Sequence, residues 1–262
     1  MNISQITGVY FSPTGGTKRV TEWITERIAD NREAEWLDLT DAVSSRPDYT
    51  FTEHELVVVG VPVYGGRVPE TARERLQKLH GKRTPAVLIV TYGNRAYEDA
   101  LLELSDILKE QGFIPAAAAA VVTEHNIAHI YGAGRPAEKD KKEMTAFAEA
   151  VREKLKSTAG STKLLELSIR GNRPYRPYGT LPLKISVSSA CEGCETCIRK
   201  CPVQAISRTD AKVTDESACI TCMRCIAVCP KHARKLGTLM TLAIRQKLKK
   251  VCTDRKDAEF VL

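Results

Sequence analysis

Eight of the nine cysteines fall into two copies of one pattern, which is the strongest chemical signal in the chain. CEGCETCIRKCP covers residues 191 to 202, and CITCMRCIAVCP covers residues 219 to 230. Each copy reads C-x2-C-x2-C-x3-C-P. Three thiolates spaced two residues apart can wrap one corner of a cubane iron–sulfur cluster, but the fourth cysteine lies too far along to close the same site. Doubled runs of this kind send the fourth cysteine to the other cluster.

The crossed arrangement predicts two [4Fe–4S] clusters, and each half of the duplication completes the site of its partner. The first ligand set is Cys191, Cys194, Cys197 and Cys229, and the second is Cys219, Cys222, Cys225 and Cys201. Structural zinc is the competing interpretation, but it usually takes two close cysteine pairs separated by a longer loop. Cys252 lies outside the repeat and is expected to be a spare thiol.

A glycine-rich loop, SPTGGTKRV at residues 12 to 20, follows the first apolar run and opens an expected helix. Backbone N–H groups and hydroxyls in such a loop suit a dianionic phosphate at the helix N-terminus. The two glycines let the backbone approach the anion without a Cβ in the way. The residues expected to bind the phosphate are Ser12, Thr14, Gly15, Gly16 and Thr17. Walker A and G-x-G-x-x-G patterns are absent, and a tight turn without a ligand is the alternative.

Two further loops carry glycines and tyrosines: VPVYGGRVP at residues 61 to 69 and TYGNRAYED at residues 91 to 99. Each follows an apolar run that is typical of a buried strand. In an open α/β sheet, ligands bind beyond the carboxyl ends of the strands, where the strand order reverses. We therefore expect these loops to converge with the glycine-rich loop, and their tyrosines can lie against a flat ring.

The elements that must position these loops alternate between apolar runs and amphipathic stretches from residue 6 to about residue 157. Strands are expected at residues 6–12, 33–39, 55–64, 84–92 and 113–122, and helices at residues 17–30, 69–80, 97–111 and 138–156. Near-continuous apolar strands that alternate with helices indicate a parallel sheet covered on both faces. The predicted fold is a doubly wound α/β domain with strand order 2-1-3-4-5, followed by a small α+β domain that contains the cysteine repeats.

Composition changes along the chain and suggests its division. We expect an α/β domain at residues 1–157, a linker rich in Pro, Gly and Arg at residues 158–184, and a cysteine-rich domain with a terminal helix at residues 185–262. Residues 1–160 hold 20 Lys+Arg and 23 Asp+Glu, a net charge of −3, and residues 161–262 hold 19 and 9, a net charge of +10. The basic part could bind nucleic acid or an acidic redox protein, or it could offset anionic cofactors.

Neither a membrane span nor a secretion signal is expected. The longest apolar run, FIPAAAAAVV at residues 113 to 122, is about half of what a bilayer requires. The first residues, MNISQITGVYF, contain no basic leader or small-residue cleavage site. These features predict a cytoplasmic location, where an array of cysteines is more typical of metal ligands than of disulfides.

The cysteine repeats resemble bacterial-type two-cluster ferredoxins over about residues 185 to 236, with all eight ligand positions matched. The loops of residues 4 to 157 resemble those of a flavodoxin, and this resemblance implies bound FMN. By position, the isoalloxazine ring would be bordered on one side by Val63, Tyr64, Gly65 and Gly66. The other side would be formed by Tyr92, Gly93, Asn94 and Tyr97, with Asn94 near the pyrimidine edge of the ring.

Two arginines depart from the flavodoxin pattern, because Arg67 and Arg95 lie in the ring loops. Positive charge close to the flavin would favour its anionic reduced form and raise its potential. Solvated surface arginines are the alternative. His125 and Asn126, which follow the fifth strand, are candidates for the edge of the flavin, although a structural loop fits the sequence equally well.

The whole order of domains resembles the flavodoxin–ferredoxin fusion proteins of anaerobic bacteria and archaea. This resemblance implies an electron-transfer protein that moves electrons between two [4Fe–4S] clusters and FMN and exchanges them with an external redox protein. The alternative is a ferredoxin-fed FMN reductase that acts on a quinone, oxygen or a nitro compound. We expect no nucleic-acid partner, because few aromatic residues interleave the basic ones. A homodimer is compatible with the sequence.

Overall fold

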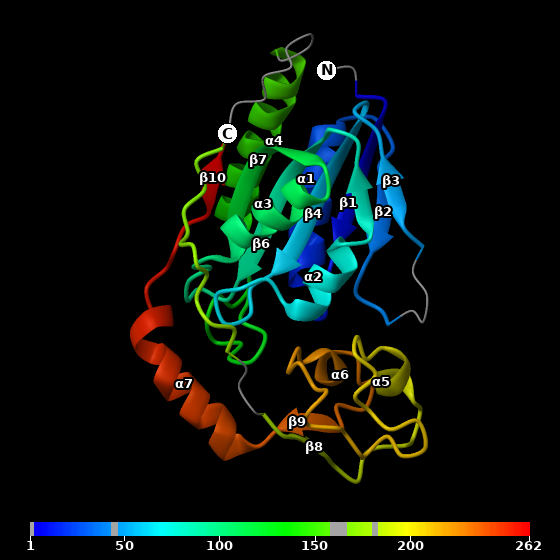
Figure 1. The fold of residues 1–262 in the computed structure, drawn as a ribbon. Helices are drawn as coiled ribbons and strands as arrows, with labels where there is room; N and C mark the ends of the chain where they lie inside the picture. Colours follow the sequence, from blue (N-terminus) through cyan, green and yellow to red (C-terminus); the bar gives the residue numbers. More distant parts are fainter. Residues whose placement is uncertain (1–2, 43–46, 158–166, 180–182) are drawn as a thin grey trace.

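The computed structural model describes residues 3–42, 47–157, 167–179 and 183–262. A six-stranded sheet forms its centre, in the order β10-β7-β6-β4-β1-β2 (Figure 1). All its strands are parallel except β10, which pairs antiparallel with β7. The strands are β1 (Gln5–Tyr10), β2 (Glu35–Asp38), β4 (Glu55–Pro62), β6 (Thr84–Tyr92), β7 (Phe113–Val122) and β10 (Glu259–Val261).

The first five strands of this sheet confirm the predicted order, because β2, β1, β4, β6 and β7 correspond to the expected strands 2-1-3-4-5. This is the flavodoxin-like, doubly wound order. A two-stranded parallel ribbon of β3 (Tyr49–Phe51) and β5 (Leu79–Gly81) lies outside the main sheet and was not expected from the sequence.

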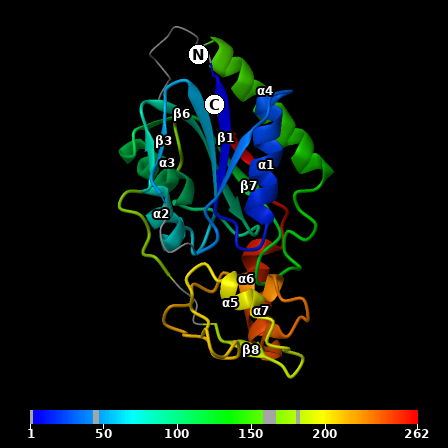
Figure 2. The same cartoon turned by 90° about the vertical axis from the view of Figure 1, so that its right-hand side faces the viewer.

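Helices cover both faces of the sheet, as the near-continuous apolar strands require. Helices α1 (Gly16–Ala29) and α4 (Glu138–Ser157) lie on one face, and α2 (Glu70–Leu76) and α3 (Ala100–Glu110) lie on the other (Figure 2). Successive strand residues point to opposite faces. In β4, Val57 and Val59 therefore belong to the core under α2 and α3, whereas Val58 belongs to the core under α1 and α4.

The cysteine-rich domain is small, and both of its cysteine repeats contain a short helix that follows a left-handed residue. Strands β8 (Ile185–Val187) and β9 (Arg234–Leu236) form an antiparallel pair, and the four-residue helices α5 (Thr196–Arg199) and α6 (Arg224–Ala227) complete the domain. Each short helix begins after a residue with left-handed backbone, Glu195 at φ 59° and Met223 at φ 62°. Both residues lie between the second and third cysteines of their repeat, so the sequence duplication is also a structural one.

The end of the chain differs from the expectation that residues 185–262 form one domain. Helix α7 (Thr238–Cys252) leaves β9 and leads back to the first domain (Figure 1), where β10 becomes the edge strand of the main sheet. The ring of Phe260 stacks on that of Phe147 in α4, with centroids 4.8 Å apart. The run EFV is too short to show a strand by periodicity, so only its pairing with β7 reveals it.

The described part of the expected linker is docked along the first domain. The backbone N–H groups of Asn172 and Arg176 donate to the Asp99 carboxylate at 2.9 Å and 2.8 Å. Arg173 binds Asp106 through two hydrogen bonds of 2.9 Å and 2.6 Å. We call residues 167–179 the strap. The rest of the expected linker, residues 158–166 and 180–182, lies outside the described residues.

Among the described segments, no helix is long and apolar enough to cross a membrane.

Replacing Phe260 by Ala should lower the free energy of unfolding by about 1–2 kcal/mol, less than the loss expected for a fully buried phenylalanine. The physical reason is the loss of the ring contact with Phe147 at the edge of the sheet. The shift of the urea midpoint, followed by circular dichroism, measures the effect. Leu262→Ala is the control, because Leu262 is 53% exposed and should change little. Equal losses in both variants would contradict the assigned role of β10.

Candidate functional site

Two cavities in the cysteine-rich domain separate the eight repeat cysteines into two groups of four. The first cavity is lined by Cys191, Cys194, Cys197 and Cys229 together with Arg234 and neighbouring residues. The second is lined by Cys201, Cys219, Cys222 and Cys225. These groups have the same membership as the two crossed ligand sets expected from the sequence. Cys252 lines neither cavity and is buried, 1% exposed, in a separate apolar cluster.

Backbone N–H groups point at the fourth cysteine of each repeat. The N–H of Ala205 lies 3.3 Å from Cys201 Sγ, and the N–H of Ala233 lies 3.3 Å from Cys229 Sγ. Hydrogen bonds to the ligating sulfurs stabilise thiolates and tune the potential of a cluster. The same donor therefore serves the equivalent sulfur in both halves of the duplication.

The spacing of the cysteines bears on which metal the cavities fit. Among the described residues, no three His, Cys, Asp or Glu side chains converge on a point that one metal ion could occupy. Zinc requires its sulfur ligands within about 2.3 Å of a single ion. Four cysteine sulfurs line each cavity, and four thiolates are the donor set of a [4Fe–4S] cluster, so the residues present fit that group.

The two cavities differ in their access to solvent. The first cavity includes an exposed sulfur, that of Cys194, and we call it the outer cavity. The second contains the buried Cys222, and we call it the inner cavity. Burial raises the pKa of Cys222 to about 12 and that of Cys225 to about 11. Without a metal these thiols would stay protonated at neutral pH, so binding of iron at the inner cavity must displace protons.

The inner cavity lies against the carboxyl ends of the strands of the first domain. Figure 1 shows α6 directly below the loops at this end of the sheet. Ile220, which lines the inner cavity, packs on the core of the first domain, as does Val63 at the end of β4. The side chain of Arg75 in α2 donates to the carbonyl oxygen of Pro202, which also lines this cavity.

Charged residues next to the inner cysteines fasten this contact. Arg224, directly before Cys225, donates to the Pro13 carbonyl oxygen at 3.1 Å and forms an ion pair with Asp41. Lys200, directly before Cys201, binds the same Asp41 carboxylate at 2.7 Å. Burial raises the pKa of Asp41, but the two cations outweigh it and hold the pKa below its ordinary value. Asp41 thus stays ionised and joins both cysteine repeats to the first domain.

The glycine-rich loop fits a phosphate group. Among the described residues, the backbone N–H groups of residues 14 to 17 have no hydrogen-bond partner, whereas the next N–H, that of Lys18, donates to Ser12 Oγ at 2.9 Å. Gly15 has φ 88°, a left-handed backbone that favours glycine. A Cβ on Gly16 would lie 3.3 Å from Thr123 Oγ1, which is a tight contact. Unsatisfied N–H groups at the N-terminus of a 14-residue helix form a site for an anion.

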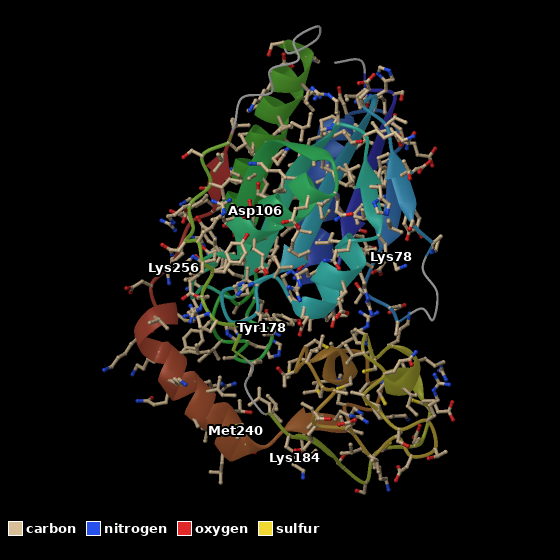
Figure 3. The ribbon with its side chains drawn as sticks, in the orientation of Figure 1. Lys78, Asp106, Tyr178, Lys184, Met240 and Lys256 are labelled. Atoms are coloured by element: carbon tan, nitrogen blue, oxygen red, sulfur yellow. The ribbon has the colours of Figure 1, made fainter. Side chains whose placement is uncertain are left out.

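Tyr64, in the loop after β4, lies close to Cys222 of the inner cavity. Two backbone hydrogen bonds with Arg67, of 3.0 Å and 3.1 Å, close the tight turn that begins at Tyr64. Burial raises the pKa of Tyr64 well above its ordinary value, and the nearby Cys222 sulfur and Tyr178 phenol raise it further. Figure 3 shows Tyr178, in the strap, between the strand ends and the cysteine-rich domain. The expected ring loop and the inner cysteines are therefore neighbours.

Side chains of the loop after β6 bind the C-terminal part of the chain. The amide of Asn94 donates to the carbonyl oxygens of Cys252 and Asp254 at 2.7 Å and 2.9 Å, at the end of α7. Tyr97 is 3% exposed, and its hydroxyl donates to Glu259 at 2.7 Å. The ring of Tyr92 packs edge-on against that of Tyr97 in the core. Asn94 and Tyr97 thus bind the returning C-terminal segment, and Tyr92 packs on Tyr97. That these residues border a flavin ring stays a prediction. Gly93 contacts His125.

The two arginines of the ring loops are paired with carboxylates. Arg67 forms two hydrogen bonds of 2.7 Å with Glu103, whose side chain is 4% exposed. Arg95 lies 2.7 Å from Glu98. Each guanidinium thus has a carboxylate partner, which offsets part of the positive charge expected near a flavin, and Arg95 keeps 34% of its side chain exposed. The strap contributes to this arrangement, because Arg67 also donates to the Arg176 carbonyl oxygen at 2.6 Å.

His125 is part of the loop that covers Gly93. Its Nδ1 accepts hydrogen bonds from the N–H groups of Ile127 and Ala128 at 3.1 Å and 3.2 Å, so the neutral ring carries its proton on Nε2. Burial lowers the pKa of His125 to about 4, and the nearby His129 and Arg95 add to this effect. The structure thus gives His125 a role in shaping the loop.

The comparisons with known proteins address both parts of the chain. A family model described as a 4Fe-4S dicluster domain matches residues 183–230. Solved structures that are similar to the first domain include a flavodoxin from the domain Archaea, at 18% identity and a TM-score of 0.39, covering 58% of this chain and 99% of that one. A flavodoxin from Streptococcus pneumonia TIGR4 has 14% identity and a TM-score of 0.42, with 58% and 99% covered. The comparison with curated proteins finds no match.

These similarities are low, so the fold assignment of the first domain rests on its own strand order. The protein combines a flavodoxin-like α/β domain with an iron–sulfur domain of the ferredoxin type. Sequence reasoning missed the contacts of Asp41, Arg224 and Lys200 at the boundary between these domains. The only sequence signal was the position of the two cations, each directly before a cysteine of the inner cavity.

The neutral His125 predicts a pH dependence of stability. Because its pKa is about 4 in the folded protein and about 6.5 when unfolded, the unfolded state binds more protons between these values. The free energy of unfolding should therefore rise as the pH increases from 4 to 6.5 and gain nothing further above that from this group. His125→Asn keeps a hydrogen-bond acceptor for Ile127 and should show a smaller rise. Parallel pH profiles for both proteins would contradict this assignment.

Proposed function

We propose that the protein is an electron carrier in which two [4Fe–4S] clusters, one in each cavity, exchange electrons with FMN bound at the glycine-rich loop. The flavodoxin-like and 4Fe-4S domains together indicate electron transfer through a flavin and iron–sulfur centres. The observation that carries the finer proposal is the contact between the two sites. Arg224 binds the carbonyl oxygen of Pro13, within the glycine-rich loop, and directly precedes Cys225 of the inner cavity.

The residues that would hold FMN divide into two groups. The unpaired N–H groups of residues 14 to 17 would bind the phosphate, and Val63, Tyr64, Gly65 and Gly66 would border the ring. FMN supplies the capacity to take up one or two electrons, whereas a cluster carries one. Gly65 and Gly66 have φ of 60° and 85°, a left-handed backbone conformation that favours glycine.

The positions of the cavities favour one route for electrons. The outer cavity has an exposed sulfur at Cys194, where an external protein can come close. The inner cavity is covered by the first domain and lies beside Tyr64. We therefore assign the outer cluster to exchange with the external carrier and the inner cluster to exchange with FMN. The excess of basic residues from 161 to 262, net +10, suits an acidic redox protein as that carrier.

A reductase that acts on a small acceptor is the second candidate, and the surroundings of the ring loops disfavour it. A Cβ on Gly65 would lie 2.9 Å from the Gly179 carbonyl oxygen, and one on Gly93 would lie 2.6 Å from the His125 ring. The strap and the loop after β7 thus cover the region where an acceptor would have to bind. Turnover with a reduced ferredoxin separates the candidates, measured anaerobically with a quinone or a nitro compound and separately with added oxygen, because the carrier should show no saturable acceptor kinetics.

Cofactor content tests the assignment of the two sites. The protein purified anaerobically should hold about eight irons and one flavin. Cys191→Ala should lose about half of the iron and keep FMN, because the outer cluster loses a ligand while the first domain is unchanged. A double variant, Thr14→Ala with Gly15→Val, should release FMN and keep the iron, because a side chain at φ 88° disrupts the phosphate loop. Loss of both cofactors from either variant would contradict the division.

The role of the domain contact is tested by Asp41→Asn. Removing this charge breaks the ion pairs with Arg224 and Lys200 that fasten the inner cavity to the first domain. Reduction of bound FMN by a reduced external carrier, followed by stopped-flow absorbance, should slow by about tenfold, whereas reduction of the clusters should keep its rate. Asp48→Asn is the control, because Asp48 pairs only with exposed residues. Equal rates in both variants would show that the contact is not needed.

A further inference from the structure

The two halves of the cysteine duplication differ at one buried position. CPVQAI at residues 201–206 corresponds to CPKHAR at residues 229–234, so Arg234 stands where the other copy has Ile206. The two segments share a left-handed residue at the corresponding position, with φ of 53° at Gln204 and 48° at His232. Ile206 lines the inner cavity and Arg234 lines the outer one. The two copies therefore differ at this position, where one has an apolar side chain, Ile206, and the other has a cation, Arg234.

Arg234 lies between the two cavities. Its guanidinium donates to the carbonyl oxygen of Ala211, which lines the outer cavity, and to Thr214 Oγ1 at 3.3 Å, which lines the inner cavity. The guanidinium thus contacts one residue of each cavity wall, Ala211 of the outer cavity and Thr214 of the inner one.

The charge of Arg234 has no protein counter-charge. Arg234 is 2% exposed, its Nε has no hydrogen-bond partner, and in the part of the chain that the structure describes it forms no ion pair. Burying an unpaired guanidinium is costly, so such a group requires an anion close by. The clusters proposed for the two cavities are anions, because the negative charge of the four thiolates exceeds the net positive charge of the iron–sulfide core.

We propose that Arg234 sets the reduction potentials of the clusters by stabilising their reduced state. This inference rests on the proposed function, since it requires clusters in the two cavities. The step concerned is the passage of one electron from an external one-electron donor to a cluster, with no bond or proton moved. The added negative charge interacts more strongly with a buried cation, and net charge around a cluster is one of the factors that set its potential. An exposed cation would have little effect, because solvent and salt screen it.

The test is an anaerobic redox titration of the intact protein, with the reduced clusters followed by electron paramagnetic resonance. Arg234→Gln removes the charge and keeps polar groups, Arg234→Lys keeps the charge, and Lys235→Gln is the matched control, because Lys235 is exposed and adjacent. We expect Arg234→Gln to change the reduction equilibrium of the clusters at least tenfold, about 59 mV toward more negative potential for a one-electron couple. Arg234→Lys and Lys235→Gln should stay near the unmodified protein.

Each outcome is decisive. An unchanged potential in Arg234→Gln, with full iron content, would overturn the inference and leave the proposed function intact. If Arg234→Gln fails to hold one cluster, restored iron content in Arg234→Lys supports the role of the charge. Loss of that cluster in both variants would overturn it, because the shape of the guanidinium would then matter and not its charge. Absence of iron from the unmodified protein would instead contradict the proposed function.

Discussion

The positions of the ligand-binding loops and of the cysteine-rich domain depend on where the parallel strands of the main sheet end. The carboxyl ends of β1, β4 and β6 meet at one edge of the sheet, and open α/β folds bind their ligands in the loops that leave such ends. The cysteine-rich domain is placed against this same edge. Asp41, at the end of β2, holds it there by pairing with the cations that precede Cys201 and Cys225. One carboxylate thereby connects both cysteine repeats to the first domain.

This placement makes two similar cysteine sites different from each other. A duplicated sequence builds two cavities with the same backbone donors, at Ala205 and Ala233. Docking then buries one cavity against the first domain and leaves the other with an exposed sulfur at Cys194. The chain adds a second difference in the interior, where Arg234 replaces the apolar residue of the other copy. The two cavities of the duplicated domain therefore differ in their exposure to solvent and in the charge of the residues that line them.

The returning segment and the strap explain why the first domain departs from a simple flavodoxin-like pattern. Asn94, expected near a flavin, binds the end of α7, and Tyr97 binds Glu259 of β10. Arg67 is held by Glu103 and by the strap. Residues that flank the strand ends therefore bind the C-terminal segment and the strap. In the loop after β4, Gly65 and Gly66 have a left-handed backbone, and Tyr64 lies near Cys222 of the inner cavity.

The sequence by itself determined the doubly wound sheet, the strand order and the membership of the two cysteine groups. Those features depend on local periodicity and spacing, since an apolar run marks a strand and three cysteines two residues apart can share one site. Only the tertiary structure decided that β10 joins the first sheet, that the strap is docked and that Arg234 is buried without a counter-charge. Each of these is a contact between residues far apart in the chain, and no local pattern records which distant group will satisfy a hydrogen bond or balance a charge.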